Sequence, residues 1–337
     1  MKIGLTYDLR TDYLAAGYDE IETAEFDRED TIEALENALI GLGHEPERVG
    51  NARQLIEALA GGKRWELVFN IAEGLRGIGR EAQVPAILDV FAIPYTFSDP
   101  LVMSLTLHKG MTKRIIRDAG IPTSDFLVFE KDGDEKDIPF PPPFFIKPVA
   151  EGTGKGVTPH SIIRRLKDLP DACIAMRRDY KQPVLVERFL PGREFTVGIT
   201  GTGENAQVVG TIEVFLLDGA EPGVYSYANK ENCEVLVEYR PVRASSDPVV
   251  GRAEAISLEA FKILGCRDAG RVDIRCDEGG KPFFLEINPL AGIHPEHSDL
   301  PLISKSVNLS YEALIERILA SARTRLGTGA NGRGRNL

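Results

Sequence analysis

Four polar residues near the C-terminal end of the chain are spaced so that one β-hairpin would gather them. Two strand-like runs flank a turn whose Gly279-Gly280 pair suits a two-residue loop. The runs are Arg271-Val272-Asp273 and Phe284-Leu285-Glu286-Ile287-Asn288. With that loop, Asp273 pairs with Glu286, and Arg271 pairs with Asn288. Because side chains alternate along a strand, all four then project from one face.

The chemistry of that face is that of a cation site. Its two carboxylates and its amide oxygen are hard ligands of the kind that Mg²⁺ takes, and Arg271 is placed for a phosphate or an oxyanion. The opposite face is apolar and is predicted to enter a core: Val272, Ile274, Leu285 and Ile287. The alternative is an amphipathic hairpin with a solvated charged face. The apolar opposite face, and an asparagine in a strand, favour the metal site.

A glycine-rich loop, Glu151–Gly156, follows a strand that ends at Lys147. Its three glycines allow close approach of the backbone, whose N–H groups can hold phosphate oxygens. The spacing is neither that of a P-loop nor that of a dinucleotide-binding turn. An ordinary strand-to-helix turn is the alternative. Lys147, together with Thr153 and Lys155 inside the loop, fits a flap that covers phosphates.

The segment Val184–Leu190 predicts a strand that leaves its sheet just before Glu194. Backbone groups exposed where a strand leaves a sheet can bind the edge of an adenine ring. An acidic residue just beyond can accept ribose hydroxyls. Taken alone, this segment is a core strand followed by a turn.

The elements that must position these residues form three successive units. The first predicts a β–α–β domain, with strands at Lys2–Tyr7 and Leu67–Ile71 around a helix at Thr31–Leu42. An acidic insert at 12–27 precedes that helix, and we expect a solvated loop there, with a lid as the alternative. The predicted domains are residues 1–106, 107–190 and 191–323, with a disordered tail at 324–337.

The composition describes a soluble globular protein of two or three domains, with 43% hydrophobic and 27% charged residues in a chain of 337. The net charge of −11 excludes a non-specific nucleic-acid binder. No run approaches the roughly twenty apolar residues of a membrane span. The four cysteines lack a CxxC spacing, and the apolar run at Lys2–Tyr7 is too short for a signal peptide. We therefore expect a cytoplasmic protein.

Five ordered motifs resemble the ATP-grasp superfamily. They are Lys147-Pro148, EGTGKGV at 151–157, VLVERFLPGREFTV at 184–197, Arg271-Val272-Asp273 and LEIN at 285–288. Within it the chain looks most like the D-alanine–D-alanine ligases, from about Leu67 to Leu319, with Lys109 in the match. The resemblance implies a three-domain ATP-grasp architecture, α/β overall and α+β in the ATP-grasp part, with a Rossmann-like N-terminal domain.

The resemblance also implies roles for individual residues. Of the residues implied to bind ATP, Lys109, Lys147 and Lys230 would hold the phosphates and Thr153 would lie in the flap. Glu187 and the backbone through Leu190 would contact adenine, and Glu194 would contact the ribose. The residues implied to bind two Mg²⁺ ions are Asp273, Glu286 and Asn288. Mn²⁺ is the alternative ion. The residues implied to stabilise the oxyanion of a tetrahedral intermediate are Arg271 and the backbone of Gly292.

The implied reaction is a carboxylate attacking the γ-phosphate of ATP, followed by an amine attacking the acyl phosphate to give an amide, ADP and phosphate. The flap must close first, because the acyl phosphate would otherwise hydrolyse. The expected partners are small amino-acid-like molecules, with neither nucleic acid nor membrane. Since the family is often dimeric, a homodimer is also expected.

The substrate half departs from the family's pattern. Glu73 stands where the family has a histidine, and Glu231 replaces a tyrosine after Lys230. Residues that could form a pocket for a different amine or acid are Glu73, Arg80, Glu81, His294, Glu296 and His297. A surface turn is the alternative for the two histidines, and a His-x-x-His metal site lacks a third ligand.

Three functions remain open from the sequence. The leading one is an ATP-dependent carboxylate–amine ligase that resembles a D-alanine–D-alanine ligase. The second is the same mechanism acting on another amino-acid or carboxylate and amine pair, for example in secondary metabolism. The third is an ATP-binding scaffold without catalysis, which the intact Arg271 disfavours.

Overall fold

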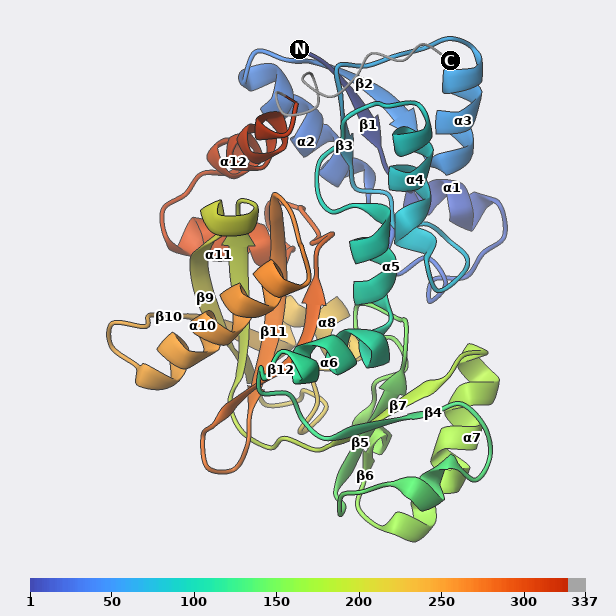
Figure 1. The fold of residues 1–337 in the computed structure, drawn as a ribbon, viewed down its shortest axis with the longest axis vertical. Coiled ribbons are helices and arrows are strands. Elements are labelled where there is room, and N and C mark those ends of the chain that lie inside the picture. Colours follow the sequence, from blue (N-terminus) through green and yellow to red (C-terminus); the bar gives the residue numbers. More distant parts are fainter. Residues whose placement is uncertain (327–337) are drawn as a thin grey trace.

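The computed structural model describes residues 1–326, which form three sheets joined by helices (Figure 1). The N-terminal sheet is parallel, in the order β2-β1-β3. Its unit contains β1 (Lys2–Thr6), α1 (Arg10–Ala15), α2 (Glu29–Gly41), β2 (Glu45–Gly50), α3 (Ala52–Ala60), β3 (Leu67–Asn70), η1 (Arg80–Ala82), α4 (Gln83–Val90) and α5 (Pro100–Leu107). The predicted strands and helix are confirmed here, while β2 and α3 add a second crossover between parallel strands.

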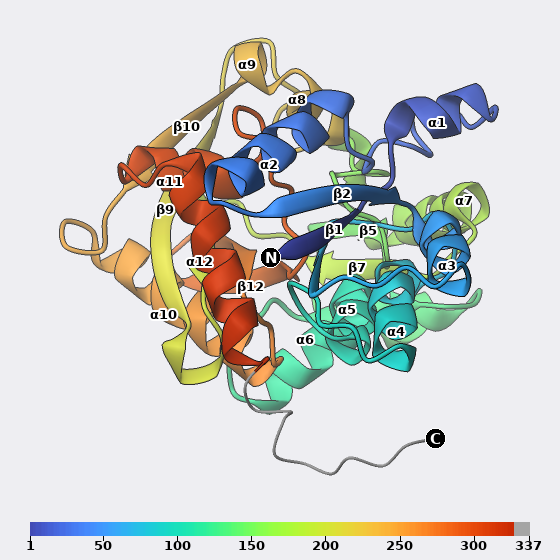
Figure 2. The ribbon, with the colours of Figure 1, turned by 90° about the horizontal axis from the view of Figure 1, so that it is seen from above.

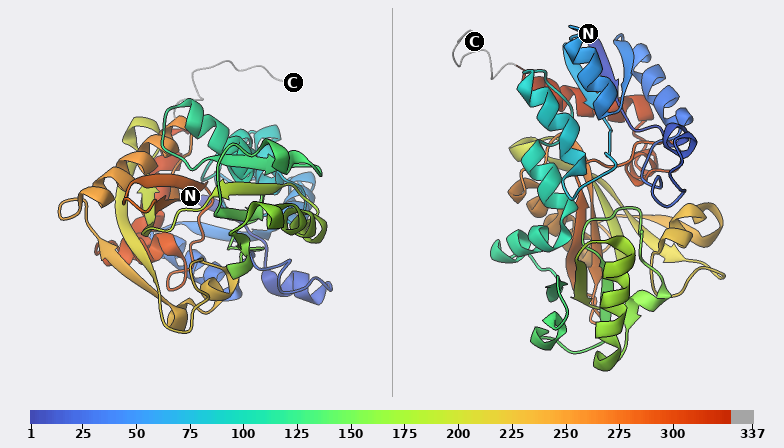
Figure 3. Two further views of the ribbon diagram at one scale, coloured as in Figure 1. Left: turned by 90° about the horizontal axis from the view of Figure 1, so that it is seen from below. Right: turned by 90° about the vertical axis from the view of Figure 1, so that its right-hand side faces the viewer.

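The middle unit is a small antiparallel sheet in the order β4-β7-β5-β6, at the end of the molecule opposite the N-terminal sheet (Figures 1 and 3). Its elements are α6 (Lys109–Asp118), β4 (Phe126–Phe129), β5 (Phe144–Pro148), β6 (Ile162–Ile163), α7 (Leu169–Tyr180) and β7 (Val184–Arg188). Strand β5 ends where the glycine-rich loop begins, and β7 carries Glu187 beside Phe145 in the register. The sheet therefore brings Lys147 and Glu187 together.

The third unit is a five-stranded antiparallel sheet in the order β10-β9-β8-β11-β12. Its elements are β8 (Glu194–Thr200), β9 (Gln207–Leu216), α8 (Tyr227–Glu231), α9 (Cys233–Leu236), β10 (Val237–Val242), α10 (Pro248–Ile263), β11 (Ala269–Cys276), β12 (Pro282–Asn288), α11 (Asp299–Ser306) and α12 (Tyr311–Thr324). Added Cβ atoms at Gly198 and Gly270 would touch α11 and α10 respectively. These two helices therefore cover opposite faces of the sheet.

The closing helix α12 returns to the N-terminal unit and packs beside α2 (Figure 2). Its Ile315 and Leu319 are buried in one core with Leu5 and Leu35. Beyond α12, Arg325 Nη2 donates hydrogen bonds to Asp268 Oδ2 at 2.8 Å and to the Tyr95 carbonyl at 3.0 Å. The prediction that disorder begins at residue 324 is therefore wrong for residues 324–326. The rest of that predicted tail lies outside the described residues.

The hairpin of β11 and β12 has the predicted pairs but not the predicted turn. Arg271 pairs with Asn288, and Asp273 pairs with Glu286. Cys276 pairs with Pro282, so the loop has five residues, and a bulge after the Asp273 pair restores the register. The bulge places Phe284, fully buried, in the core where Leu285 was expected. Leu285 instead lines a cavity.

Other features of the described residues bear on location and chemistry. Within residues 1–326, no helix is both long and apolar enough to cross a membrane. None of the four cysteines, Cys173, Cys233, Cys266 and Cys276, is joined to another in a disulfide. None of the predicted site residues is a cysteine.

Candidate active site

A cavity with about 760 Å³ of empty space, part of it open to solvent, lies between the four-stranded and five-stranded sheets. Its apolar lining residues are Phe145, Pro148, Val157, Phe189, Leu190 and Leu285. Its charged lining residues include Lys109, Lys147, Glu187, Glu194, Asp273 and Glu286. A cavity that is apolar on one side and charged on another suits a ligand with a flat ring and an anionic tail.

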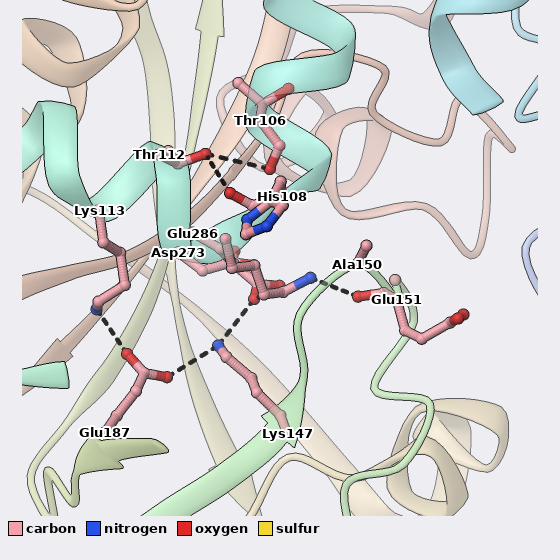
Figure 4. A network of polar contacts seen from close by, with 12 residues as sticks. Thr106, His108, Thr112, Lys113, Lys147, Ala150, Glu151, Glu187, Asp273 and Glu286 are labelled. Atoms are coloured by element: carbon pink, nitrogen blue, oxygen red, sulfur yellow. Dashed lines mark hydrogen bonds and ion pairs between the residues drawn. The ribbon is translucent and has the colours of Figure 1, made fainter. Parts of the chain in front are cut away.

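A chain of buried ion pairs forms the charged wall of this cavity (Figure 4). Lys147 Nζ lies 3.1 Å from Glu286 Oε2 and 3.3 Å from Glu187 Oε2. Glu187 Oε1 lies 2.5 Å from Lys113 Nζ and accepts a hydrogen bond from Ser124 Oγ at 3.1 Å. The wall thus joins α6, β5, β7 and β12 around two carboxylates. Lys113 was not identified from the sequence, because only the fold brings α6 against β7.

Burial and ion pairing fix the charges in this wall. Burial would raise the pKa of Glu187, but Lys113 and Lys147 lower it to about 2. The pKa of Glu286 is likewise lowered, against the effect of burial, by Lys147 and Lys109. Burial lowers the pKa of Lys109, whereas two carboxylates outweigh burial and raise that of Lys147. Both carboxylates are therefore ionised at neutral pH.

The polar face of the hairpin stands between this cavity and a second one. Asp273 lines the first cavity, Arg271 and Asn288 line the second, and Glu286 lines both. Arg271 forms an ion pair with Asp273, and its Nε lies 3.4 Å from Asp299 Oδ2. Thr196 Oγ1 donates a hydrogen bond to Asp273 Oδ1 at 3.0 Å. The structure therefore brings together all four side chains predicted from the hairpin.

The hairpin residues fit a Mg²⁺ site that is completed by a ligand. Among residues 1–326, no three His, Cys, Asp or Glu side chains are grouped closely enough to hold a metal ion unaided. Two carboxylates and the amide of Asn288, whose buried nitrogen has no hydrogen-bond partner, could hold Mg²⁺ with phosphate oxygens. This use of few protein ligands is typical of Mg²⁺.

The glycine-rich loop folds over the junction of the two cavities. Lys109 Nζ donates a hydrogen bond to the Glu151 carbonyl, and both residues line both cavities. Thr153 has a left-handed φ of 48°, and its buried hydroxyl has no partner. A Cβ on Gly154 would lie 2.9 Å from the Tyr227 amide nitrogen, so this loop touches the segment that carries Lys230. The flap therefore meets the segment that carries Lys230.

The second cavity is larger, with about 1880 Å³ of empty space that is partly open to solvent, and most of the predicted substrate residues line it. Those that line it are Glu73, Glu81, Gly292, His294 and His297. Lys230 also lines it, with its ammonium 4.6 Å from the centre of the Tyr225 ring. The second cavity shares five lining residues with the first cavity: Lys109, Glu151, Tyr225, Lys230 and Glu286. A molecule in one cavity can therefore reach a molecule in the other.

Three carboxyl groups that line the second cavity form no ion pair within 4.0 Å among residues 1–326: Asp27, Glu73 and Glu81. Arg80 is near enough to oppose the effect of burial on the pKa of Glu73 and Glu81, but it pairs directly with Glu25. Burial raises the pKa of Glu81 to about 7 and that of Asp27 to about 8, with nearby acids adding to the rise. Burial also raises the pKa of Glu73 well above its usual value. Unpaired carboxyls that resist ionisation are suited to a cationic ligand.

The two histidines lie at a turn that forms part of the cavity wall, and the His297 side chain is 42% exposed. Their rings stack with centroids 4.5 Å apart. His294 Nε2 lies 3.3 Å from Asp30 Oδ2, and His297 Nδ1 lies 3.5 Å from Glu234 Oε1. Glu296 does not line the cavity and instead pairs with Lys305 at 2.8 Å.

Two other predicted residues are engaged by protein groups. Arg80 does not line either cavity, because its guanidinium pairs with Glu25 at 2.8 Å and donates to the Ala150 carbonyl at 2.9 Å. Glu194 lines the first cavity and lies 3.0 Å from Arg275 Nη1.

The acidic insert is mostly exposed over residues 12–22, as expected of a solvated loop, but its last five residues depart from that expectation, with Thr23 and Phe26 buried. The Glu25 side chain is only 7% exposed, and both Glu25 and Asp27 line the second cavity. Phe26 between them is buried, and it anchors the segment against Tyr13. The three aromatic residues of this acidic insert, Tyr13, Tyr18 and Phe26, were the local signal that part of it is packed.

Comparison with known proteins agrees with this geometry. A family model described as "D-ala D-ala ligase C-terminus" matches residues 115–320. A D-alanine–D-alanine ligase of Bordetella avium is 33% identical over 275 residues, which cover 80% of this chain and 82% of that protein. Two solved structures share the fold, each with a TM-score of 0.72. A Bacillus anthracis D-alanine–D-alanine ligase complexed with ATP is 20% identical and covers 98% of this chain and 100% of its own. The VanG D-Ala:D-Ser ligase of Enterococcus faecalis is 19% identical, and the match covers 95% of this chain and 99% of that one.

The fold and the paired cavities define an ATP-grasp ligase, an enzyme that uses ATP to join a carboxylate and an amine. The chain belongs to the D-alanine–D-alanine ligase family. The scaffold alternative is therefore set aside.

Proposed function

We propose that this enzyme activates an amino-acid-like carboxylate as an acyl phosphate and transfers it to an amine, with D-alanine as the first candidate for both substrates. The observation that carries the proposal is the position of the hairpin face between two connected cavities. One cavity has the shape and charge for ATP. The other is large enough for two small amino-acid-like molecules, and it is lined by Arg271 and Glu286.

In this proposal the first cavity binds MgATP. Adenine would lie against Leu190 and the backbone after Glu187, with the ribose at Glu194. Lys109, Lys147 and Lys230 would hold phosphate oxygens beneath the Thr153 flap. Asp273, Glu286 and Asn288 would hold two Mg²⁺ ions, or Mn²⁺, and bound metal would neutralise charge on the phosphates.

The chain's own residues then provide the remaining requirements of the reaction. Lys109 and Lys147 offset the negative charge that builds up as the substrate carboxylate attacks the γ-phosphate and ADP leaves. Arg271 and the Gly292 backbone N–H would stabilise the oxyanion formed when the amine attacks the acyl carbon. Collapse of that intermediate breaks the bond to phosphate and leaves an amide. The flap excludes the water that would compete with the amine.

The unpaired carboxyls favour a second candidate substrate class. An amino group near Asp27, Glu73 and Glu81 would restore their ionised forms. A single α-ammonium needs one such partner, so three suggest a substrate with an additional positive charge. A basic amino acid or a diamine would meet that requirement.

The test is an assay of ADP release and amide formation with purified protein, ATP and Mg²⁺. D-alanine alone, D-alanine with D-serine, D-lysine and a short diamine form the first panel. Dipeptide from D-alanine alone would support the first candidate. Amide formation only with the cationic amines would support the second. Absence of ADP release with every carboxylate tried, in protein that still binds ATP, would contradict both.

We also propose that the enzyme is cytoplasmic and forms a homodimer. Four cysteines that are not joined in disulfides support a reducing compartment. Sedimentation of the purified protein would test the dimer, and a monomer at micromolar concentration would contradict it.

A further inference from the structure

The guanidinium of Arg271 lies between two carboxylates that come from different parts of the fold. On one side it forms an ion pair with Asp273, its neighbour on the same face of β11. On the other side, Arg271 Nε lies 3.4 Å from Oδ2 of Asp299, the first residue of α11. Within residues 1–326, the remaining nitrogen, Nη2, donates no hydrogen bond and is not fully enclosed. Nη2 is therefore the nitrogen of Arg271 that is left for a ligand.

The two carboxylates face different cavities. Asp273 lines the first cavity, where we propose that it binds Mg²⁺. Asp299 lines only the second cavity, as Arg271 does. A bound metal ion is the largest charge near its ligands, so it weakens the attraction of a ligating carboxylate for a neighbouring guanidinium. Asp299 would then be the carboxylate that still attracts Arg271.

The start of a helix does not by itself explain the Asp299 side chain. An acid in the first turn is favoured by the helix dipole, and this is the simplest reason for an aspartate there. The Asp299 carboxylate accepts no hydrogen bond from a backbone N–H within residues 1–326, and its side chain is only 13% exposed. A carboxylate removed from water to this extent needs a charged partner. Arg271 is the partner that the structure provides.

The electrostatics of this corner also direct Asp299 toward Arg271. Burial lowers the pKa of Arg271, but Asp273 and Asp299 outweigh burial and raise it. Beyond Asp299, the phenol groups of Tyr225 and Tyr239 are hydrogen-bonded to each other. Burial, and after it the charge of Asp299, raises the pKa of both phenols. The phenols therefore stay neutral and leave Arg271 as the positive charge that Asp299 balances.

Packing fixes the start of α11 and the turn that leads to it. Leu300, next to Asp299, is fully buried, and a Cβ on Gly198 of β8 would lie 3.1 Å from its Cδ1. A Cβ on Gly292 would lie 2.8 Å from Ser298 Oγ, so the turn closes tightly on the residue before Asp299. The two groups proposed for the oxyanion, Arg271 and the Gly292 N–H, are thus both tied to the start of α11.

We propose that Asp299 is a positioning residue that keeps Arg271 directed at the oxyanion once Asp273 binds Mg²⁺. The inference rests on the proposed function, in which Asp273 is a metal ligand and Arg271 stabilises the oxyanion. There are two competing views. In one, Asp299 only stabilises the start of α11. In the other, Asp299 binds the amine substrate directly.

The order parameter of the Arg271 Nε–H bond, from ¹⁵N relaxation of the full chain, tests this with no substrate present. Arg271→Lys identifies the signal. In the wild type the order parameter should be about 0.85, with or without Mg²⁺ and the non-hydrolysable analogue AMP-PNP. In Asp299→Asn it should fall below about 0.6 once Mg²⁺ and AMP-PNP are added. Without them it should fall less, because Asp273 still pairs with Arg271.

The matched control is Glu312→Gln, which alters an exposed acid in the first turn of α12. Its Arg271 signal should equal that of the wild type. A wild-type order parameter in Asp299→Asn with Mg²⁺ and AMP-PNP would overturn the proposal, because both competing views predict that result in the absence of an amine. An equal fall with and without Mg²⁺ and AMP-PNP would also overturn it, since Asp273 would then hold nothing.

Kinetics separate this inference from the function on which it rests. With D-alanine as the probe, Asp299→Asn should lower kcat about tenfold or more, as expected for the loss of an interaction between charged groups. KM for ATP should change less than about twofold, and circular dichroism checks that the variant is folded. If the wild type forms no amide from D-alanine, that substrate is wrong, and the order parameter still decides the role of Asp299. An unchanged kcat in Asp299→Asn, in an enzyme active on D-alanine, would overturn the proposal.

Discussion

The two cavities differ in how their buried charges are satisfied. In the first cavity, which we propose binds ATP, Lys147 and Glu187 each have partners within 3.3 Å. Glu187 also forms an ion pair with the buried Lys113. In the second cavity, which we propose binds the substrates, Glu73 and Glu81 form no ion pair within 4.0 Å among residues 1–326, and Arg80 only partly offsets the effect of burial on their pKa. A cavity whose charged side chains are already paired by other protein groups suits a ligand that is the same in every reaction, such as ATP. A cavity whose charged side chains lack protein partners needs a ligand that supplies the opposite charge. We therefore expect the second cavity to decide which substrates are used.

The largest expected effect comes from the hairpin face, which both cavities share. Glu286→Ala should reduce turnover at least about 1000-fold, since it removes a charge that must be placed within the reacting site and leaves Lys147 with one partner fewer. ADP release measures the loss, and circular dichroism checks that the variant is folded. Glu278→Ala, an exposed acid in the turn of the same hairpin, is the control. Near-normal turnover in Glu286→Ala would remove Glu286 from the proposed Mg²⁺ site.

The balanced network of the nucleotide cavity predicts a stability effect. Lys113→Met should lower the free energy of unfolding by about 3 kcal/mol, because it leaves one side of a fully buried carboxylate unpaired. Urea unfolding measures the change. Lys113→Met with Glu187→Gln should recover part of it. A loss below about 0.5 kcal/mol in the single variant would mean that the pair contributes nothing to stability.

The unbalanced charges predict a change in substrate affinity instead. Glu73→Ala should raise KM for the amine about tenfold or more while changing KM for ATP much less, because a hydrogen bond to a charged group is lost only on the substrate side. Glu73→Gln tests the same position with the size retained. A rise confined to KM for ATP would place Glu73 outside the substrate cavity.

The smallest expected effect is a pH dependence of stability. Burial raises the pKa of Glu81 from 4.5 to about 7, so the folded state binds a proton that the unfolded state has released between these values. Stability from this group is complete below pH 4.5 and is lost as the pH rises through 7. Glu81→Gln should therefore be more stable than wild type at pH 8 but not at pH 4. Urea unfolding at both values measures it, and a gain independent of pH would contradict the raised pKa.

Local pairing rules predicted the chemistry of the hairpin better than its shape. The pairs of Asp273 with Glu286 and Arg271 with Asn288 are confirmed. They were derived from a two-residue turn that does not form, and the bulge compensates for the longer loop. Because a one-residue slip moves side chains to the other face, Leu285 and Phe284 exchanged places in the prediction.

Contacts between distant segments were beyond prediction from the sequence. Glu25 looked like part of a solvated acidic loop, since only the folded chain brings it to Gly152, 127 positions away. Arg80 looked like a substrate residue for the same reason, and its actual partners are protein groups. Motifs identified residues that act on a common ligand, whereas residues that hold those motifs in place need three-dimensional contacts to be found.

The central claim is that the two cavities cooperate through an acyl phosphate. The direct test uses a substrate carboxylate labelled with ¹⁸O, D-alanine first, in the presence of ATP, Mg²⁺ and the amine, with mass analysis of the released phosphate. The account predicts one ¹⁸O atom in the phosphate for each amide formed. Amide formation with no label in phosphate, or with label in AMP, would contradict it.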